Sequence, residues 1–359
     1  MNSCFTKRKK TCMMLFLIVS VVCMMSTNVL AASVAKIGAK KYKTVQSAVN
    51  AAKDGQTVKI LKAVSTSKPV TVSKKNITID FAKKKYTFRS AKGDAFQLKS
   101  GSLTFRNMNL VSKCNAVNVG SGAKLTILSG SSTGCITNRG TLLVKNGKFQ
   151  GAGSGYDEED YSIDFPAIMN YGSLTVLKGT FTGNNRPLII NYSQAVIKGG
   201  NYNATGLLSY NLKNQGGSDC VMVIKGGKFK GEIFNECSGH GQLLVLGGTF
   251  TAEKKQKALT NYNGRVLIAG GTFSGTDSNV VLNHFDDEIY VGGTMIITGG
   301  SFKSTGMWGT VATESEMIIT GGTFLVNGET KGAIRLYPLD DRSVCYTSSS
   351  LKLTVDVIE

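Results

Sequence analysis

Two histidines are the side chains of this sequence that could exchange a proton near neutral pH, because imidazole has an unperturbed pKa of about 6.5. They are His240 and His284. Nothing in the sequence pairs them with each other or with a nucleophile, and a loop histidine is the simpler interpretation. The sequence therefore predicts no catalytic residue, and His240 is kept as the single candidate.

One stretch of the chain is densely acidic and could attract a metal ion. Asp157, Glu158, Glu159 and Asp160 follow one another, and Asp164 lies close behind. Calcium prefers carboxylate ligands, but a defined site needs ligands that converge from spaced positions. No Lys or Arg lies among these residues to take a proton. We expect a solvated loop and no cofactor, with weak calcium binding at Asp157–Asp160 as the alternative.

A set of aromatic residues suits binding better than catalysis. Seven asparagines recur at intervals of 20 to 32 residues, each after an apolar segment: Asn138, Asn170, Asn191, Asn211, Asn235, Asn261 and Asn283. Four of the residues that directly follow them are Tyr171, Tyr192, Tyr262 and His284. An exposed tyrosine suits a sugar ring or a protein partner. These four are the predicted binding residues, and the alternative is that they close gaps between coils.

A repeat in the sequence predicts the strands and turns that position these residues. Eight segments read aliphatic strand, glycine turn, aromatic residue, from LLVKNGKF at 142–149 to MIITGGTF at 317–324. Their aromatic residues are separated by 21 to 32 residues: Phe149, Phe181, Tyr202, Phe229, Phe250, Phe273, Phe302 and Phe324. A constant unit at irregular spacing indicates stacked coils with variable outer loops.

Alternation along each repeat strand places residues on an inner and an outer face. We expect the inner aliphatic residues and the aromatic residues to form columns one coil spacing apart, about 4.8 Å. The asparagines should form a hydrogen-bonded column at a turn. The outer positions are also largely apolar, which suggests that something covers them: Leu143, Val196, Val223, Leu244, Leu267, Ile296 and Ile318. The fold class is therefore all-β, a parallel β-helix solenoid.

The ends of the chain carry different signals. Residues 1–31 combine Lys7–Lys10, an apolar run and small residues at the end, as in a secretory signal peptide. We expect a protein that is secreted or held at the cell surface, with a single β-helix domain over 32–359, a helix over 42–54 covering the first coil and a C-terminal cap over 331–359. No transmembrane segment is expected after removal of residues 1–31.

Five cysteines follow residue 31, namely Cys114, Cys135, Cys220, Cys237 and Cys345. An odd number over a long chain argues against a disulfide framework. We interpret them as small buried apolar residues. A bridge from Cys114 to Cys135, or from Cys220 to Cys237, is the alternative, because these spacings approach one coil.

The segment YKTVQSAVNAAKDGQTVKIL, at 42–61, resembles the opening helix and first strand of the pectin lyase-like superfamily. The glycine-turn repeats resemble its non-catalytic bacterial surface members. The resemblance implies a right-handed parallel β-helix. Relatives that hydrolyse polygalacturonate carry Asn-Thr-Asp, paired Asp, Gly-His-Gly and Arg-Ile-Lys in that order. Here Gly239-His240-Gly241 stands alone, and Asp286-Asp287 follows it instead of preceding it.

The charge of the chain is concentrated at one end. Residues 32–113 carry 18 Lys or Arg and 3 Asp or Glu, whereas residues 114–359 carry 20 of each kind. This excess of positive charge produces an electrostatic field that attracts polyanions and weakens as the salt concentration rises. Alternatively, the lysines keep a solenoid end soluble and unpaired.

We therefore expect a secreted, non-catalytic β-helix protein for adhesion or for binding an extracellular polysaccharide, a cell-wall polymer or a surface protein. The alternative is a polysaccharide lyase or glycoside hydrolase that acts on an acidic polysaccharide. Nucleic acid is not expected as a partner, because the chain carries an export signal and no nucleic-acid-binding motif.

Overall fold

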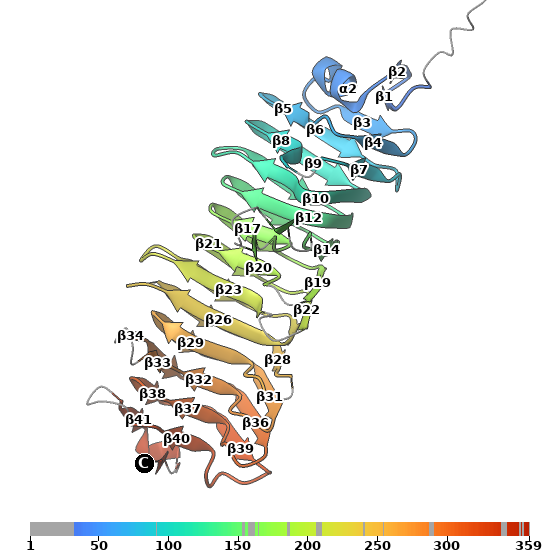
Figure 1. Ribbon diagram of the computed structural model, residues 1–359. Helices are drawn as coiled ribbons and strands as arrows, with labels where there is room; N and C mark the ends of the chain where they lie inside the picture. The colour runs from blue at the N-terminus through green and yellow to red at the C-terminus, as the bar shows by residue number, and fades with distance from the viewer. Residues whose placement is uncertain are drawn as a thin grey trace, which may run out of the picture. The chain divides into compact units, whose positions relative to one another are not determined.

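Each copy of the repeat folds as a short strand that pairs in parallel with the strand of the next copy (Figure 1). The computed structural model describes residues 32–90, 92–152, 155–156, 162–163, 165–184, 187–205, 210–239, 241–253, 255–286, 291–338, 343–351, 353 and 355–358. All elements below belong to the unit Val34–Glu359. Its strands stack into three ladders, so the predicted all-β parallel β-helix is confirmed.

The first ladder contains the repeat strands. In spatial order it runs β2 (Lys40–Tyr42), β1 (Ala35–Ile37), β3 (Thr57–Ile60), β6 (Lys75–Asp80), β9 (Gly101–Arg106), β11 (Lys124–Ile127), β13 (Thr141–Val144), β18 (Ser173–Val176), β21 (Gln194–Ile197), β24 (Val221–Ile224), β27 (Gln242–Val245), β30 (Arg265–Ile268), β35 (Thr294–Ile297), β38 (Met317–Ile319) and β41 (Cys345–Thr347). β1 pairs antiparallel with β2 and β3, and the later pairs are parallel.

The second ladder carries the aromatic residues. It contains β4 (Val64–Thr66), β7 (Tyr86–Phe88), the first part of β10 (Met108–Val119) and of β12 (Gly130–Asn138), then β14 (Lys148–Gln150), β19 (Thr180–Asn184), β22 (Asn201–Thr205), β25 (Lys228–Lys230), β28 (Thr249–Thr251), β31 (Thr272–Thr276), β36 (Ser301–Thr305) and β39 (Thr323–Val326).

The third ladder carries the asparagines. It contains β5 (Val70–Val72), β8 (Asp94–Leu98), the later parts of β10 and β12, then β17 (Ile168–Asn170), β20 (Ile189–Asn191), β23 (Tyr210–Gly216), β26 (Glu232–Cys237), β29 (Leu259–Asn263), β32 (Val281–Asn283), β37 (Val311–Thr313), β40 (Ile334–Leu336) and β42 (Val355–Val357). Two short hairpins, β15 (Gly155–Tyr156) with β16 (Ser162–Ile163) and β33 (Phe285–Asp286) with β34 (Val291–Gly292), lie outside the ladders.

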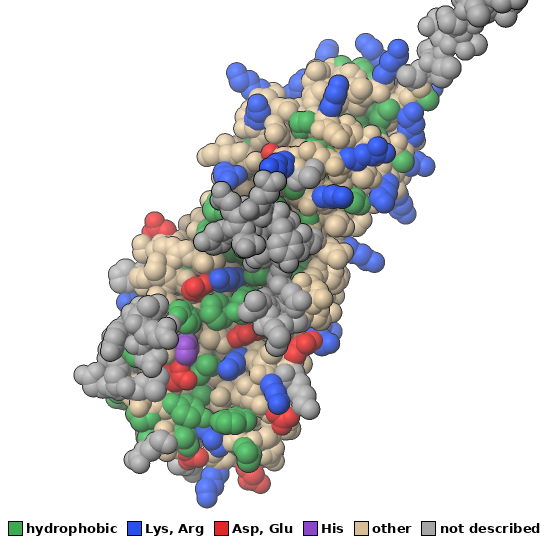
Figure 2. All heavy atoms as spheres, in the orientation of Figure 1, with side chains coloured by type: hydrophobic (Ala, Val, Ile, Leu, Met, Phe, Trp, Pro, Cys, Tyr) green, Lys and Arg blue, Asp and Glu red, His purple; other side chains and the backbone are tan. Residues whose placement is uncertain are grey.

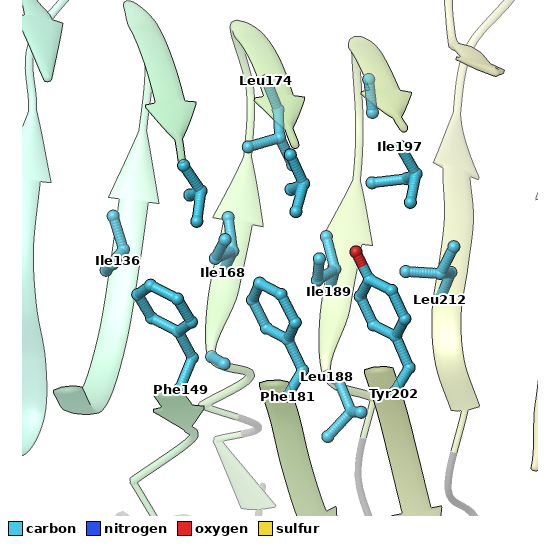
Figure 3. Packing of buried hydrophobic residues seen from close by; sticks show 14 of the residues in the cluster. Ile136, Phe149, Ile168, Leu174, Phe181, Leu188, Ile189, Ile197, Tyr202 and Leu212 are labelled. Carbon is cyan, nitrogen blue, oxygen red and sulfur yellow. The ribbon is translucent and has the colours of Figure 1, made fainter. Parts of the chain in front are cut away.

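The core is built from columns of side chains that repeat at every coil, as the sequence predicts. Phe149, Phe181 and Tyr202 follow one another along the solenoid beside aliphatic residues of the third ladder (Figure 3). From Phe149 to Phe324, neighbouring ring centroids of the column lie 4.4 to 4.9 Å apart. Because coils repeat at about 4.8 Å, identical positions of successive coils are brought into van der Waals contact.

A glycine is required at the turn between the first and second ladders. Gly248 has a φ of +123°, which L side chains rarely adopt, and a Cβ on it would lie 3.0 Å from Cζ of Phe250. The turn therefore needs a residue without a side chain, both for the backbone conformation and for the aromatic column behind it.

The asparagine column is confirmed with one correction. Side-chain amides bond from coil to coil over distances of 2.7 to 2.9 Å, through Asn138, Asn170, Asn191, Asn214, Asn235, Asn261 and Asn283. The predicted member Asn211 is wrong, since Asn214 is the residue in register with Asn191. Leu212 points into the core two residues before Asn214, just as Ile189 does before Asn191.

One end of this unit is covered by a short helix, α2 (Val45–Ala51), within the predicted 42–54. Thr44 caps it, because its hydroxyl accepts a hydrogen bond from the backbone N–H of Ser47. Val45, Ala48 and Val49 are buried, and the helix contacts β1, β2, β3 and β5. It thereby covers apolar side chains of the first coil.

Strands of the predicted C-terminal cap continue the ladders. β40 pairs with β37, β41 with β38, and β42 with β40, and the 3₁₀ turn Ser349–Leu351 lies between β41 and β42 in the chain. In the part of the chain that the structure describes, no helix is long and apolar enough to cross a membrane.

Candidate functional site

Two of the predicted binding residues stack on each other at the corner between the third and first ladders. The ring centroids of Tyr171 and Tyr192 lie 4.7 Å apart with an angle of 4° between the planes. The guanidinium of Arg139, one coil earlier, lies 5.3 Å from the Tyr171 centroid. Arg139 and Tyr192 both pack against the Tyr171 ring, which is nevertheless 41% exposed, so this ring offers its edge to solvent.

The other two predicted residues belong to a separate aromatic row on the outer face of the third ladder. Ring centroids are 4.7 Å apart for Tyr210 and Phe234, 5.9 Å for Phe234 and Tyr262, and 5.3 Å for Tyr262 and His284. The four predicted residues therefore lie in two groups. The series of aromatic residues after the column asparagines is interrupted at Asn214, because the residue that follows it is Gln215.

His284 ends the second row in contact with a carboxylate. Its Nδ1 lies 2.5 Å from Oε2 of Glu314, which also accepts a hydrogen bond from the backbone N–H of Phe285 at 3.2 Å. The histidine is thus oriented by an acidic neighbour from the next coil. The sequence did not predict this contact between His284 and Glu314.

Two carboxylates that the sequence pattern does not single out lie on β26. The strand alternates, so that Ile233 and Asn235 point inward while Glu232 and Glu236 lie on the outer face. Burial raises the pKa of Glu232, while a hydrogen bond from the Thr260 hydroxyl lowers it. Burial also raises the pKa of Tyr210, and both carboxylates add to that shift, so all three groups are neighbours.

The backbone spacing of Glu232 and Glu236 is wider than the spacing of paired glycosidase carboxylates. Four residues of a strand separate the two Cα atoms by about 13 Å, at 3.3 Å per residue. Paired glycosidase carboxylates lie about 5 to 9.5 Å apart. In addition, the Nζ of Lys213 lies 2.7 Å from Oε2 of Glu236, so that this carboxylate is already paired.

Lysines face one another across the first three strands of the first ladder. Lys36 of β1 is in register with Lys41 of β2 on one side and with Lys59 of β3 on the other. Lys41 and Lys59 are exposed, and Lys36 is partly buried. We call these three residues the lysine face. Figure 2 shows Lys and Arg side chains gathered over the end of the unit that carries these strands.

None of the described acidic residues of the same region forms an ion pair with the lysine face. Asp54 accepts hydrogen bonds from the backbone and side chain of Asn76, and these bonds lower the pKa of its carboxyl group. Asp80 accepts from Ala82 and Asn107, and Asp94 accepts from Gln97, Asn115 and Asn118. Within 32–113, no Lys or Arg that the structure describes forms an ion pair within 4.0 Å with a described Asp or Glu.

Comparison with family models, with curated proteins and with solved structures finds no match to this chain. The candidate sites therefore rest on the geometry and chemistry of the chain's own residues.

Two predicted candidates lie outside the described residues, namely His240 and the acidic stretch Asp157–Asp160. The described residues hold no cluster of three or more His, Cys, Asp or Glu that could bind a metal ion. Calcium binding at Asp157–Asp160 thus stays a prediction.

The five cysteines are free thiols, and all but the half-buried Cys345 are buried. Cys220 and Cys237 nevertheless contact each other, and the hydrogen bond that Cys237 donates to Cys220 raises the pKa of the Cys237 thiol. The interpretation as small buried residues fits this arrangement.

The apolar outer stripe of the first ladder is partly exposed along its whole length. Around Leu244, Leu267 and Ile296 it borders a shallow cavity of about 320 Å³, which is rimmed by Arg265 and Glu316. Polar residues at the rim interrupt the apolar stripe at this point.

Proposed function

We propose that this chain is an extracellular β-helix protein that binds an acidic polymer through the lysine face and does not cleave it. The observation that carries this proposal is the register of Lys41, Lys36 and Lys59 on three adjacent strands. Like charges directly opposite one another destabilise a sheet. A bound polyanion would remove this repulsion, whereas the acids of the region are occupied by structural hydrogen bonds.

The partner of such a surface is a polymer with regularly spaced anionic groups, such as an acidic polysaccharide or a cell-wall polymer. Strands lie about 4.8 Å apart, so the ammonium groups form a short row across the strands. The remaining exposed lysines of 32–113 extend the positive field around this row. Residues 1–31, with the pattern of an export signal, support an extracellular location.

We further propose that the chain is a non-catalytic member of the pectin lyase-like superfamily. Support comes from the segment 42–61, in which a capped helix precedes β3 of the first coil. Parallel coils with a hydrogen-bonded asparagine column agree with that proposal. Fold alone does not specify activity, so the binding proposal depends on the lysine face.

The test compares two sets of three neutralised lysines in the full chain. Lys36→Gln, Lys41→Gln and Lys59→Gln together remove the lysine face, and the matched control is Lys148→Gln, Lys228→Gln and Lys303→Gln, three exposed lysines of later coils that pair with no lysine on either neighbouring strand. Binding to immobilised polygalacturonate is measured at low and at high salt. One exposed ion pair contributes about 0.2 to 1 kcal/mol, so the first triple should weaken binding roughly tenfold at low salt.

The control triple should bind as the unchanged protein does, and the difference between the triples should shrink in high salt, where screening sets in within a few ångströms. Equal losses in both triples would show that charge alone, and not the lysine face, attracts the polymer. Incubation with polygalacturonate, with and without calcium, should release no unsaturated or reducing ends. New ends would favour the lyase or hydrolase alternative.

A further inference from the structure

An exposed tryptophan lies at the other end of the stack, in the turn between β36 and β37. Trp308 is the only tryptophan of the chain and is 51% exposed, and its neighbour Met307 is 77% exposed. Large apolar side chains at such exposure are not required by the core. We call residues 306–309 the tryptophan turn.

Four side chains donate hydrogen bonds to the backbone of the tryptophan turn, and three of them come from other segments. Each of its four backbone carbonyl groups accepts a hydrogen bond from a side chain, and the donors are, in order along the turn, Asn327, Arg335, Asn279 and Ser304. The backbone N–H of Gly306 also donates to Oδ1 of Asn327 at 3.0 Å. An apolar tip fixed in this way loses little conformational entropy when a ligand binds to it.

Trp308 borders a cavity of about 340 Å³ on the outer side of the third ladder. Tyr337, Asp277, Glu314 and Lys257 are among the other lining residues. They come from four different segments, so the coils build a pocket that no single loop could form. Its size lies at the lower end of the range for small-molecule sites.

Several polar groups of the cavity have capacity for a ligand. Among the described residues, the Asp277 carboxylate and the Tyr337 hydroxyl have no side-chain hydrogen-bond partner, and Asp277 is exposed. Oε2 of Glu314 is engaged by His284 and Phe285, whereas its Oε1 accepts no hydrogen bond. The carboxylates of Asp277 and Glu314 and the hydroxyl group of Tyr337 thus line the same cavity as the indole ring of Trp308.

From this arrangement we infer that the cavity is a binding site for a neutral pyranose ring of a saccharide chain. Such a ring presents a flat C–H face that packs on an exposed indole, and hydroxyl groups at its edge that bond with carboxylates, a phenol and an ammonium group. Unlike the tyrosine pair at 171 and 192, Trp308 has no stacked aromatic neighbour in the described chain.

The charges of the cavity favour a neutral sugar over an acidic one. Asp277 and Glu314 bring two negative charges, Lys257 brings one positive charge, and His284 lies against Glu314. A uronic acid would bring its own carboxylate close to those of Asp277 and Glu314, and like charges repel. This site therefore differs in ligand chemistry from the lysine face and does not depend on it.

The single tryptophan makes the test specific. Tryptophan emission of the full chain is followed during titration with cellohexaose, mannohexaose and N-acetylchitohexaose. We expect a saturable change in emission with at least one of the three, insensitive to sodium chloride. Asp277→Asn and Tyr337→Phe keep Trp308 and should each weaken the affinity, by roughly tenfold for a lost hydrogen bond to a charged group at Asp277.

Met307→Ala is the matched control, because it removes the more exposed side chain of the same turn without changing a lining residue of the cavity. Its affinity should equal that of the unchanged protein. The inference is overturned if none of the three hexasaccharides changes the emission, or if Met307→Ala alone abolishes the change while Asp277→Asn and Tyr337→Phe retain it. Loss of polygalacturonate binding in the lysine triple would leave it intact, so the two proposals fail separately.

Discussion

Replacing Asn214 by alanine should destabilise the protein far more than replacing Asn211, although both side chains are fully buried and only three residues apart. Asn214 makes four hydrogen bonds. It accepts from Asn191 at 2.9 Å and from the Cys220 thiol at 3.0 Å, and it donates to Asn235 at 2.8 Å and to the carbonyl of Gln242 at 3.0 Å.

Asn211 makes fewer hydrogen bonds than Asn214. Its Oδ1 accepts one hydrogen bond, from the backbone N–H of Ala204 at 3.0 Å, and its Nδ2 is buried without a partner. A typical hydrogen bond contributes about 1 kcal/mol net, which gives about 4 kcal/mol for Asn214→Ala and about 1 kcal/mol for Asn211→Ala. Both substitutions delete the same atoms, so the cavity contribution is similar and the difference of about 3 kcal/mol reports the hydrogen bonds.

The measurement is equilibrium unfolding in urea, followed by far-ultraviolet circular dichroism, on the two variants and the unchanged protein. The midpoint should fall strongly for Asn214→Ala and little for Asn211→Ala, at a constant slope of free energy against urea. Equal losses, or a larger loss for Asn211→Ala, would refute the register of β23 with β20 and with it the corrected asparagine column.

Three further predictions concern the core and its buried groups. Burial raises the pKa of Cys135 to about 12 and that of Cys345 to about 11, so neither thiol should react with a thiol reagent at pH 8 until the protein is unfolded. Burial raises the folded-state pKa of Glu232, so the charged form of this side chain destabilises the fold. Glu232→Gln should therefore increase the free energy of unfolding at pH 7. This gain should vanish as the pH falls below about 4, where the carboxyl group is protonated in both the folded and the unfolded state. Phe250→Ala, which removes a ring between two stacked neighbours, should cost about 3 to 5 kcal/mol in urea unfolding.

The interior of the solenoid could be predicted because each coil repeats the same constraint. An inward position of one coil lies against the same position of the next, so a periodic residue type in the sequence, such as Phe250 and Phe273, becomes a physical contact. Where the period is interrupted the prediction was wrong. Asn211 and Asn214 are both compatible with the spacing, and only the inward Leu212 and the pairing with β20 distinguish them.

The surface could not be predicted in the same way, because outer residues are not constrained by the coil above. The hairpin of β1 and β2 was missed, since three-residue strands leave almost no alternation to detect, and with it the register of Lys36 and Lys41. Gly38, at a φ of +55° between these strands, is the signal that could have revealed the turn. Trp308 was missed because its turn depends on side chains 20 to 30 residues away.

The two proposed sites should act independently, and the architecture gives the reason. Ten strand steps of the first ladder separate β3, which carries Lys59, from β35, which belongs to the coil of Trp308. At about 4.8 Å per step this is about 48 Å, several times the Debye length of about 8 Å at physiological salt. Each coil contacts only its neighbours, so the middle coils transmit neither charge nor a second conformation between the ends. Occupation of the lysine face by polygalacturonate should therefore leave the hexasaccharide affinity at Trp308 unchanged, and a shift in that affinity would show coupling that stacked coils do not provide.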